Sequence, residues 1–305
     1  MLKVISIENF KGGTGKSSLC QNLAAYLAAK GVRVLIVDGD RQRNTTTTLL
    51  GGWYPSAGKE QPTLKEVIEG VAPLDQAIYQ GRYQDLMYEN PGNEDENVYE
   101  ERIRENIFVI PSHPDLDKAA VYLSSHRHAF YTLRTGLKNA MEIQQARRMT
   151  SNGLVSVPLS SPFQVVLIDH AGSYSPVMEA LLLASTGMFI PMELEPYCVA
   201  GIFDMEKKLK ADLPDHQVLN YGIIPYAVHR GKAMTAQYLY ELEEEFGDLV
   251  IQDICTDANI PKAQSYFETI LEYKPKPTAK TFRSPSQADF ETLATYVIET
   301  ILEAA

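Results

Sequence analysis

Residues 3–30 read KVISIENFKGGTGKSSLCQNLAAYLAAK. A β-branched run from Lys3 to Ile7 leads into a glycine-rich segment, and apolar residues then recur at the helical period from Ser17 to Lys30. The predicted order is therefore strand, loop and helix. Gly31 ends the helix, and the nearly continuous apolar run Val32 to Val37 is typical of a strand covered on both faces of a parallel sheet. This stretch predicts a complete βαβ unit.

Further apolar runs alternate with helical patterns, which predicts an α/β fold with a doubly wound, mostly parallel sheet flanked by helices. The other predicted strands cover residues 107–110, 165–168, 187–190 and 221–224. Helices are predicted over residues 63–71, 116–141, 175–183, 200–210, 232–246 and 286–303. We expect one domain spanning residues 1–305, with surface excursions at residues 51–62 and an insertion near residues 80–106.

The composition excludes several classes of protein. The chain has 305 residues, 45% of them hydrophobic, which is enough for a sizeable core. Its three cysteines form no Cys-x-x-Cys pair, so neither a disulfide framework nor a zinc site is indicated, and we expect a cytosolic protein. The first ten residues leave no room for a signal peptide, and no apolar run approaches the roughly 20 residues of a membrane span.

Charge is distributed unevenly along the chain. The formal net charge of −11 argues against a surface that is basic all over, but it leaves room for a local basic patch. Residues 89–105 (ENPGNEDENVYEERIRE) hold part of the acidity. The simplest interpretation is a solvated loop or insertion, and the alternative is a specific acidic docking segment.

The segment KGGTGKSS, residues 11–18, has the chemistry of a phosphate-binding loop. Successive glycines let backbone N–H groups turn toward phosphates, and the following helix presents its positive end. Lys16 can meet the β- and γ-phosphates, and Ser17 can ligate Mg²⁺. The strict P-loop pattern fails because Phe10 stands at its first glycine position. The alternative is a glycine-rich turn that merely starts a helix.

This segment resembles the deviant Walker A loop of the ParA/MinD superfamily, in which a second lysine, here Lys11, opens the motif. The resemblance implies an ATPase with the P-loop NTPase fold that uses ATP and Mg²⁺. Lys11 would cross a nucleotide-sandwich homodimer to the partner's ATP and neutralise charge on the transferred phosphoryl group. The alternative for Lys11 is a solvated surface charge. The predicted ATP-binding residues of the loop are Lys11, Gly12, Gly13, Thr14, Gly15, Lys16, Ser17 and Ser18.

Two further segments carry candidate carboxylates. VDGDRQ, residues 37–42, resembles the family's Asp-x-Asp-Pro-Gln segment, with Arg41 in place of proline. The resemblance implies that Asp40 positions or deprotonates the attacking water and that Asp38 supports the metal region. The alternative is that both carboxylates end a strand and cap the next turn.

FQVVLID, residues 163–169, has the form of a Walker B strand, and its terminal Asp169 would hold Mg²⁺ through water. The family's following prolines are replaced here by Ala171 and Gly172. We interpret His170 as a structural or switch residue rather than a metal ligand. The predicted catalytic residues are Lys11, Lys16 and Asp40. The predicted metal-site residues are Ser17, Asp38, Asp40 and Asp169.

The resemblance continues at residues 110–116 (IPSHPDL), 191–201 (PMELEPYCVAG) and 259–262 (NIPK). It places Pro225, Tyr226 and Pro261 in the segments that enclose the adenine base. Residues 80–106 and 147–161 are extra relative to a small family member.

The end of the chain distinguishes between branches of the family. Residues 290–305 contain no Lys or Arg, so the basic membrane helix of MinD-like members is missing and no membrane partner is expected. ParA-like members bind DNA nonspecifically, and Arg230 is placed similarly to one of their arginines. Lys232 and Lys262 would join it in a phosphate-contacting patch. The other candidate lysines are Lys274, Lys276 and Lys280, and the alternative for each lysine is an ordinary solvated residue.

The sequence therefore predicts a ParA-like ATPase, cytoplasmic and nucleoid-associated. It would form ATP-dependent homodimers on DNA and position a plasmid, chromosome or other cargo with a ParB-like partner that stimulates hydrolysis. Two alternatives remain. A metabolic enzyme or metal-cluster carrier would need a substrate pocket or paired thiolates. A scaffold of the same superfamily would bind ATP without appreciable turnover and without binding DNA.

Overall fold

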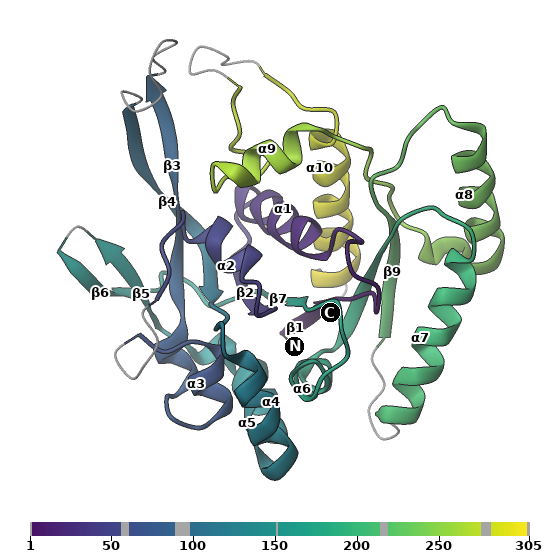
Figure 1. Ribbon diagram of the computed structural model, residues 1–305. Coiled ribbons are helices and arrows are strands. Elements are labelled where there is room, and N and C mark those ends of the chain that lie inside the picture. The colour runs from purple at the N-terminus through teal and green to yellow at the C-terminus, as the bar shows by residue number, and fades with distance from the viewer. Residues whose placement is uncertain are drawn as a thin grey trace.

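The computed structural model describes residues 2–55, 61–88, 98–150, 152–213, 219–275 and 282–303. In these ranges nine strands form one sheet in the order β6-β5-β3-β4-β2-β7-β1-β8-β9 (Figure 1). The strands are β1 Lys3–Ile7, β2 Val34–Gly39, β3 Tyr79–Tyr88, β4 Val98–Ile110, β5 Gln145–Thr150, β6 Gly153–Pro158, β7 Val165–His170, β8 Gly187–Met192 and β9 Leu219–Pro225.

The central strands β4, β2, β7, β1, β8 and β9 all run parallel, which confirms the predicted doubly wound α/β fold. Antiparallel pairs extend the sheet at one side, because β3 runs against β4 and β6 against β5. Strand β7 lies between β1 and β2, so the carboxyl ends of these three strands meet at one edge.

Helices cover both faces of the sheet. They are α1 Lys16–Ala29, α2 Asn44–Leu49, α3 Leu64–Ile68, α4 Leu116–Ser125, α5 His128–Lys138, α6 Pro176–Ala184, α7 Cys198–Asp212, α8 Ala233–Phe246, α9 Asn259–Ser265 and α10 Gln287–Tyr296. Shorter helical turns are η1 Leu74–Ala77, η3 Ala140–Glu142 and η4 Gly247–Leu249, and Val297–Leu302 continues α10 as a π-helix.

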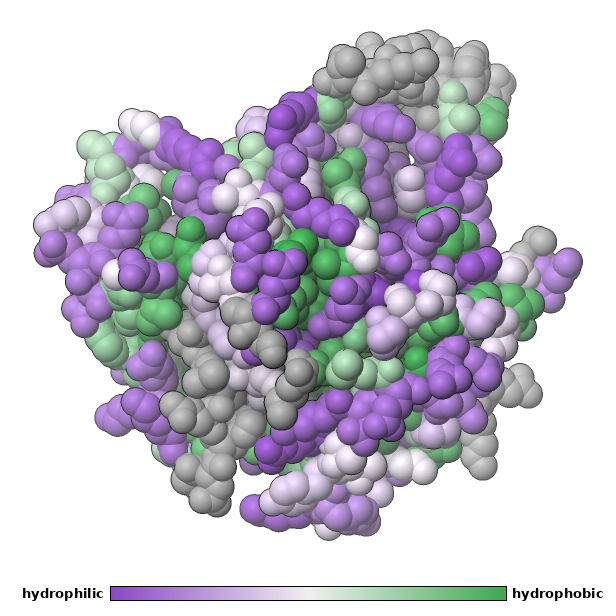
Figure 2. Space-filling view, turned by 180° about the vertical axis from the view of Figure 1, so that it is seen from behind, coloured by the Kyte–Doolittle hydropathy of each residue, from purple (hydrophilic) through white to green (hydrophobic). Residues whose placement is uncertain are grey.

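One apolar core joins the sheet to α1, α9 and α10, and a second joins it to α3, α4, α5 and α6. Val34 and Ile36 of β2 belong to the first core, and Leu35 and Val37 belong to the second. Because both faces of β2 are covered, the strand reads as a continuous apolar run. Among the described residues, no helix is both long and apolar enough to span a membrane. Figure 2 shows hydrophilic and apolar side chains interspersed on the face turned away from the viewer of Figure 1.

One sequence prediction about local structure was wrong. The helix predicted over residues 116–141 is two helices, because His126 leaves the helical region with φ −131° and ψ 71°. The described part of the insertion predicted near residues 80–106 is the hairpin of β3 and β4, which projects at the upper left of Figure 1. Residues 89–97 of the acidic segment lie outside the described residues.

The hairpin pairs its charges both across and along its strands. Arg82 bonds Glu101 across the two strands at 2.6 Å, and Arg102 contacts Asp85 across them at 3.5 Å and Glu100 of its own strand at 2.8 Å. Opposite charges that face each other on neighbouring strands stabilise a hairpin. A charge-rich sequence is therefore compatible with regular strands here.

Candidate functional site

The phosphate loop follows β1 and turns directly into α1. Gly13 and Gly15 have φ of +81° and +85°, a region that side chains with a Cβ rarely adopt. Tyr226 lies flat against the second of these glycines, since a Cβ at Gly15 would be 2.3 Å from its ring. The Tyr226 hydroxyl also donates to Ser18 Oγ at 2.7 Å. The tyrosine therefore supports the loop through its last residues.

Lys16 is buried, and its ammonium group lies beneath the loop. Nζ donates to the carbonyl oxygens of Asn9 at 2.9 Å and Lys11 at 2.7 Å. Gly172, which follows the Walker B strand, packs closely on the same loop, because a Cβ there would be 3.0 Å from Gly12 Cα and 3.8 Å from Lys16 Nζ. The loop and the segment after β7 are thus in direct contact.

Two predicted metal-site carboxylates face each other across neighbouring strands. Asp38 of β2 is in register with Asp169 of β7, and both side chains are fully buried. Helix α2 holds them both at its first turn. Thr45 Oγ1 donates to Asp169 Oδ2 at 2.6 Å, and Thr46 donates to Asp38 Oδ2 from its hydroxyl at 2.6 Å and its backbone nitrogen at 2.7 Å.

The two carboxylates differ in whether both of their oxygens accept hydrogen bonds. Asp38 Oδ1 accepts from Asp40 N at 3.1 Å, so both of its oxygens bind the chain that follows β2. Asp169 Oδ1 is buried and has no hydrogen-bond partner among the described residues. Burial raises the pKa of Asp169 to about 6, and the hydrogen bond from Thr45 and the nearby Ser17 hydroxyl group oppose this rise. An unpaired buried oxygen beside Ser17 fits a divalent cation with oxygen ligands.

Asp40 lies outside the strand and faces the loop. Its Oδ1 accepts from Gln42 N at 2.9 Å, which fixes the turn between β2 and α2. Its charge contributes to the raised pKa of Asp169. The neighbouring Arg41, which stands where the family has proline, forms an ion pair with Asp117 of α4 at 2.5 Å.

His170 is a buried core residue. Its Nε2 lies 2.7 Å from Ser6 Oγ, and its Nδ1 lies 3.6 Å from Glu8 Oε2. Burial, with the charge of Lys16, lowers the pKa of His170 to about 3, and burial raises the pKa of Glu8 to about 8. Both groups are therefore neutral at pH 7, and the short distance between them is not an ion pair.

These segments enclose a cavity of about 530 Å³. It is lined by residues 12–18 of the loop together with Gln21, Asp40, Asn44, Thr47, Thr48, His170, Gly172, Gln264 and Phe267. Asp38 and Asp169 are not among the lining residues. The predicted adenine contacts Pro225, Tyr226 and Pro261 are not among them either.

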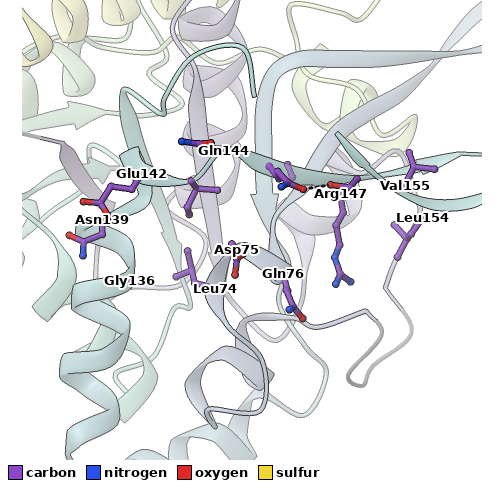
Figure 3. A pocket seen from close by; sticks show the side chains of 14 residues that line it. Leu74, Asp75, Gln76, Gly136, Asn139, Glu142, Gln144, Arg147, Leu154 and Val155 are labelled. Carbon is purple, nitrogen blue, oxygen red and sulfur yellow. Dashed lines mark hydrogen bonds between the residues drawn. The ribbon is translucent and has the colours of Figure 1, made fainter. Parts of the chain in front are cut away.

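A larger cavity of about 840 Å³ lies elsewhere, beneath the β5–β6 hairpin. Figure 3 shows Arg147 of β5 and Gln76 of η1 toward one end of it, and Asn139 and Glu142 toward the other. None of the predicted site residues lines this cavity, so its greater volume does not make it the candidate active site.

Comparisons with known proteins agree with this geometry. A family model described as an AAA domain matches residues 2–213, more than half of the chain. The chain belongs to this family, of the ParA/MinD type. Members of the ParA/MinD family are ATPases.

The chain is similar to curated proteins over most of its length. The chromosome partitioning protein ParA of Caulobacter vibrioides is 25% identical over 276 residues, which cover 89% of this chain and 87% of the relative. The chromosome-partitioning ATPase Soj of Thermus thermophilus is 27% identical, and the match covers 98% of this chain and 97% of the relative.

Solved structures share the fold. An ATP complex of Cyanothece McdA has a TM-score of 0.67 at 20% identity, covering 98% of this chain and 95% of that chain. The septum site-determining protein MinD from Pyrococcus horikoshii, complexed with Mg-ADP, has a TM-score of 0.64 at 21% identity, covering 100% and 99%.

In this ParA/MinD-type chain, Lys11 lies apart from the phosphate cavity. It is exposed and forms an ion pair with Glu195, and it lines a separate small pocket with Glu193 and Glu195. The hydrogen bond to Glu195 raises the pKa of Lys11. The lysine is therefore charged and directed toward the segment that precedes α7.

The predicted DNA-binding residues lie on the carboxyl-terminal half. Lys232 and Lys262 are exposed, at the start of α8 and on α9. Arg230 is bound to two carboxylates, Asp253 at 2.8 Å and Asp289 at 2.9 Å. Its charge is therefore partly neutralised within the chain. Of the other candidate lysines, Lys274 lies 3.8 Å from Asp85, and Lys276 and Lys280 lie outside the described residues.

Sequence reasoning missed two groups of residues that contribute to the site. Thr45 and Thr46 hold the buried carboxylates, and the threonine run at residues 45–48 directly after the Asp38–Asp40 segment was a signal for them. Gln264 and Phe267 line the cavity from a distant part of the sequence. For these two residues the sequence contained no local signal.

Proposed function

We propose that this chain binds ATP with Mg²⁺ and hydrolyses it to ADP and phosphate. The observation that carries the proposal is the shared cavity of about 530 Å³, in which the glycine loop, Lys16 and Asp40 face one another. Asp169 lies immediately behind them with an unpaired buried oxygen. A phosphate-binding loop, a candidate for orienting water and a candidate metal ligand are the groups that phosphoryl transfer to water requires.

The loop would bind the phosphates mainly through its backbone. Its N–H groups and the N-terminal end of α1 offer partial positive charge to phosphate oxygens. The Lys16 ammonium group, now bound to the carbonyl oxygens of Asn9 and Lys11, would exchange these weak acceptors for the charged oxygens of the β- and γ-phosphates.

Ser17 and Asp169 would hold Mg²⁺, with Asp40 nearby. The metal would neutralise charge that develops on the phosphate oxygens during transfer. Asp38 would act through the chain rather than by ligation, because its two oxygens already accept hydrogen bonds from Asp40 and Thr46. Asp40 would orient or deprotonate the attacking water.

Lys11 would act in a homodimer that forms when ATP is bound. Because the Lys11 side chain is exposed, it could break its ion pair with Glu195 and reach the nucleotide bound by a second copy of the chain. A charge supplied in this way stabilises the transferred phosphoryl group only in the assembled dimer. Hydrolysis by a single copy would therefore be slow.

We further propose that the dimer binds DNA nonspecifically through Lys232, Lys262 and Arg230. The chain would be a single ATPase domain of residues 1–305, cytoplasmic and associated with the nucleoid. It would partition a plasmid, chromosome or other cargo with a ParB-like partner that stimulates hydrolysis. The similarity to partitioning proteins of Caulobacter and Thermus supports this proposal.

The test is binding to a random-sequence DNA duplex by the wild type and Lys16→Ala, with Mg²⁺ and ATP, ADP or no nucleotide, across a salt titration. We expect binding that requires ATP and Lys16 and weakens steeply with salt. If the protein binds ATP but binds no DNA with ATP, with ADP or without nucleotide, the DNA-partition proposal fails.

A second candidate is a positioning scaffold of the same family. Such a scaffold binds ATP, but it does not bind DNA and does not hydrolyse ATP appreciably. The observation in its favour is the altered switch, where Arg41 is anchored to Asp117 and His170 is buried against Ser6. A steady-state ATPase rate indistinguishable from that of Asp40→Ala would favour the scaffold.

A further inference from the structure

Arg104 of β4 lies behind the nucleotide cavity and connects three segments. Its side chain is 2% exposed and forms a bidentate ion pair with the Glu272 carboxylate, in which both hydrogen bonds measure 2.7 Å. It also donates to carbonyl oxygens of Thr48 at 2.9 Å, Leu49 at 2.7 Å and Phe267 at 3.0 Å. A planar guanidinium group with five N–H donors is suited to bind several acceptors at once.

Two of these acceptors belong to the last turn of α2, whose first turn holds the carboxylates. Thr45 bonds Asp169 and Thr46 bonds Asp38, and the carbonyl groups of Thr48 and Leu49 bond Arg104. Helix α2 has only six residues, too few to be stable without tertiary contacts. Its position therefore depends on the groups bound at its two ends.

A second connection reaches the same carboxylate from the other wall of the cavity. The segment after α9 bonds Arg104 through the carbonyl oxygen of Phe267, and Gln264 of α9 itself donates to Gln21 Oε1 at 3.1 Å. Gln21 donates to Thr45 Oγ1 at 3.0 Å, and Thr45 donates to Asp169. Arg104 thus closes a ring of hydrogen bonds around the outer end of the cavity.

We propose that Arg104 is a positioning residue for the metal site, acting through α2 to hold Thr45 against Asp169. The proposal rests on the function proposed above, because it assumes that Asp169 serves Mg²⁺. It adds that the β3–β4 hairpin is coupled to that site, since Arg104 is part of β4. Without Arg104, the buried carbonyl group of Leu49 loses its donor, and that of Thr48 keeps only the 3.3 Å bond from Gly51 N. The helix then shifts or frays.

The experiment compares Arg104→Met and Arg104→Lys with the wild type. Arg104→Lys keeps the charge for Glu272 but cannot supply the full set of donors. Arg102→Met is the matched control, because Arg102 lies on the same strand but pairs only with Asp85 and Glu100 in the contacts described above. Amide hydrogen exchange in nucleotide-free protein is measured for residues 44–50, with residues 128–138 of α5 as an internal reference.

We expect exchange in residues 44–50 to become at least tenfold faster in both Arg104 variants, with α5 and Arg102→Met unchanged. In a second measurement, a fluorescent ATP analogue is titrated in EDTA and in Mg²⁺. In EDTA, the dissociation constant of each Arg104 variant for the analogue should lie within twofold of the wild-type value. The factor by which Mg²⁺ increases the affinity should be at least fivefold smaller in the variants than in the wild type.

The inference is overturned if residues 44–50 exchange as in the wild type, or if α5 accelerates equally, which would indicate general destabilisation. Equal weakening of nucleotide binding with and without Mg²⁺ would also overturn it. If the wild type binds no ATP analogue at all, the proposed function fails, and the exchange result still decides whether Arg104 holds α2.

Discussion

Substitution of Gly15 by alanine tests the contact between the phosphate loop and Tyr226. The new Cβ would lie 2.3 Å from Cδ1 and 2.4 Å from Cε1 of the Tyr226 ring, well inside van der Waals contact. The tyrosine is buried, and its hydroxyl is bound to Ser18. The ring must therefore move, or the loop must leave its conformation.

Two costs add in the Gly15→Ala variant. The left-handed backbone, at φ +85°, costs roughly 1–2 kcal/mol once a Cβ is present. Displacement of a packed ring costs about 1–3 kcal/mol more. The expected loss in the free energy of unfolding is therefore about 2–5 kcal/mol. Tyr226→Ala alone should cost about 3–5 kcal/mol, and adding Gly15→Ala to it should cost only the backbone part, about 1–2 kcal/mol.

The assay is urea unfolding of the nucleotide-free protein for the two single variants and the double variant. Gly12→Ala is the control, because a Cβ at Gly12 meets no atom within 4 Å, and it should cost less than about 1 kcal/mol. If Gly15→Ala lowers the free energy of unfolding by the same amount with and without the Tyr226 ring, the predicted contact is refuted. If that loss equals the loss in Gly12→Ala, the predicted backbone strain at residue 15 is refuted as well.

Four other predictions concern charge and turnover. Because the pKa of Glu8 is raised from 4.5 to about 8, the folded protein holds a proton that the unfolded chain releases, so stability should fall by about 1–2 kcal/mol from pH 6.5 to 8. Urea unfolding at several pH values should show this slope in the nucleotide-free wild type and a flatter one in Glu8→Gln. Asp40→Ala should retain ATP binding by filter assay while steady-state hydrolysis falls about 10²–10⁴-fold; an unchanged rate would exclude its role. Lys11→Ala should abolish ATP-dependent dimers in sedimentation while leaving the melting temperature of the nucleotide-free protein unchanged. Lys232→Glu and Lys262→Glu should each reduce the slope of log DNA affinity against log salt by about 0.9, and an unchanged slope would remove that lysine from the interface.

The central sheet and the phosphate loop could be predicted because their signals are local. Strands such as Val34–Gly39 and Val165–His170 are buried on both faces and read as apolar runs. The loop is recognisable because its glycines, lysine and serine are consecutive. The β3–β4 hairpin could not be predicted in the same way, since the charges that suggest a solvated loop are satisfied by partners on the opposite strand, as with Arg82 and Glu101.

The site was only partly predictable for a related reason. Asp40 follows β2, and Asp169 lies near the end of β7. The carboxyl ends of these neighbouring strands meet, so topology brings the two residues together. The anchoring of Asp38 by Thr46 and the contribution of Phe267 depend on how α2 and the segment after α9 pack, which short motifs do not record. Similarly, the two acidic partners of Arg230 are distant in sequence.

The position of β7 between β1 and β2 has a consequence for synthesis on the ribosome. Strand β1 pairs with β7 and β8, and β2 pairs with β4 and β7, so the first two strands are not neighbours. A nascent chain that has emerged only as far as α5 contains the whole phosphate loop but none of the strands that flank β1. Strand β1 would lack both of its neighbours until β7 and β8 have left the exit tunnel, and β8 ends at Met192. The order of translation therefore delays nucleotide binding at least until the chain has emerged as far as Met192.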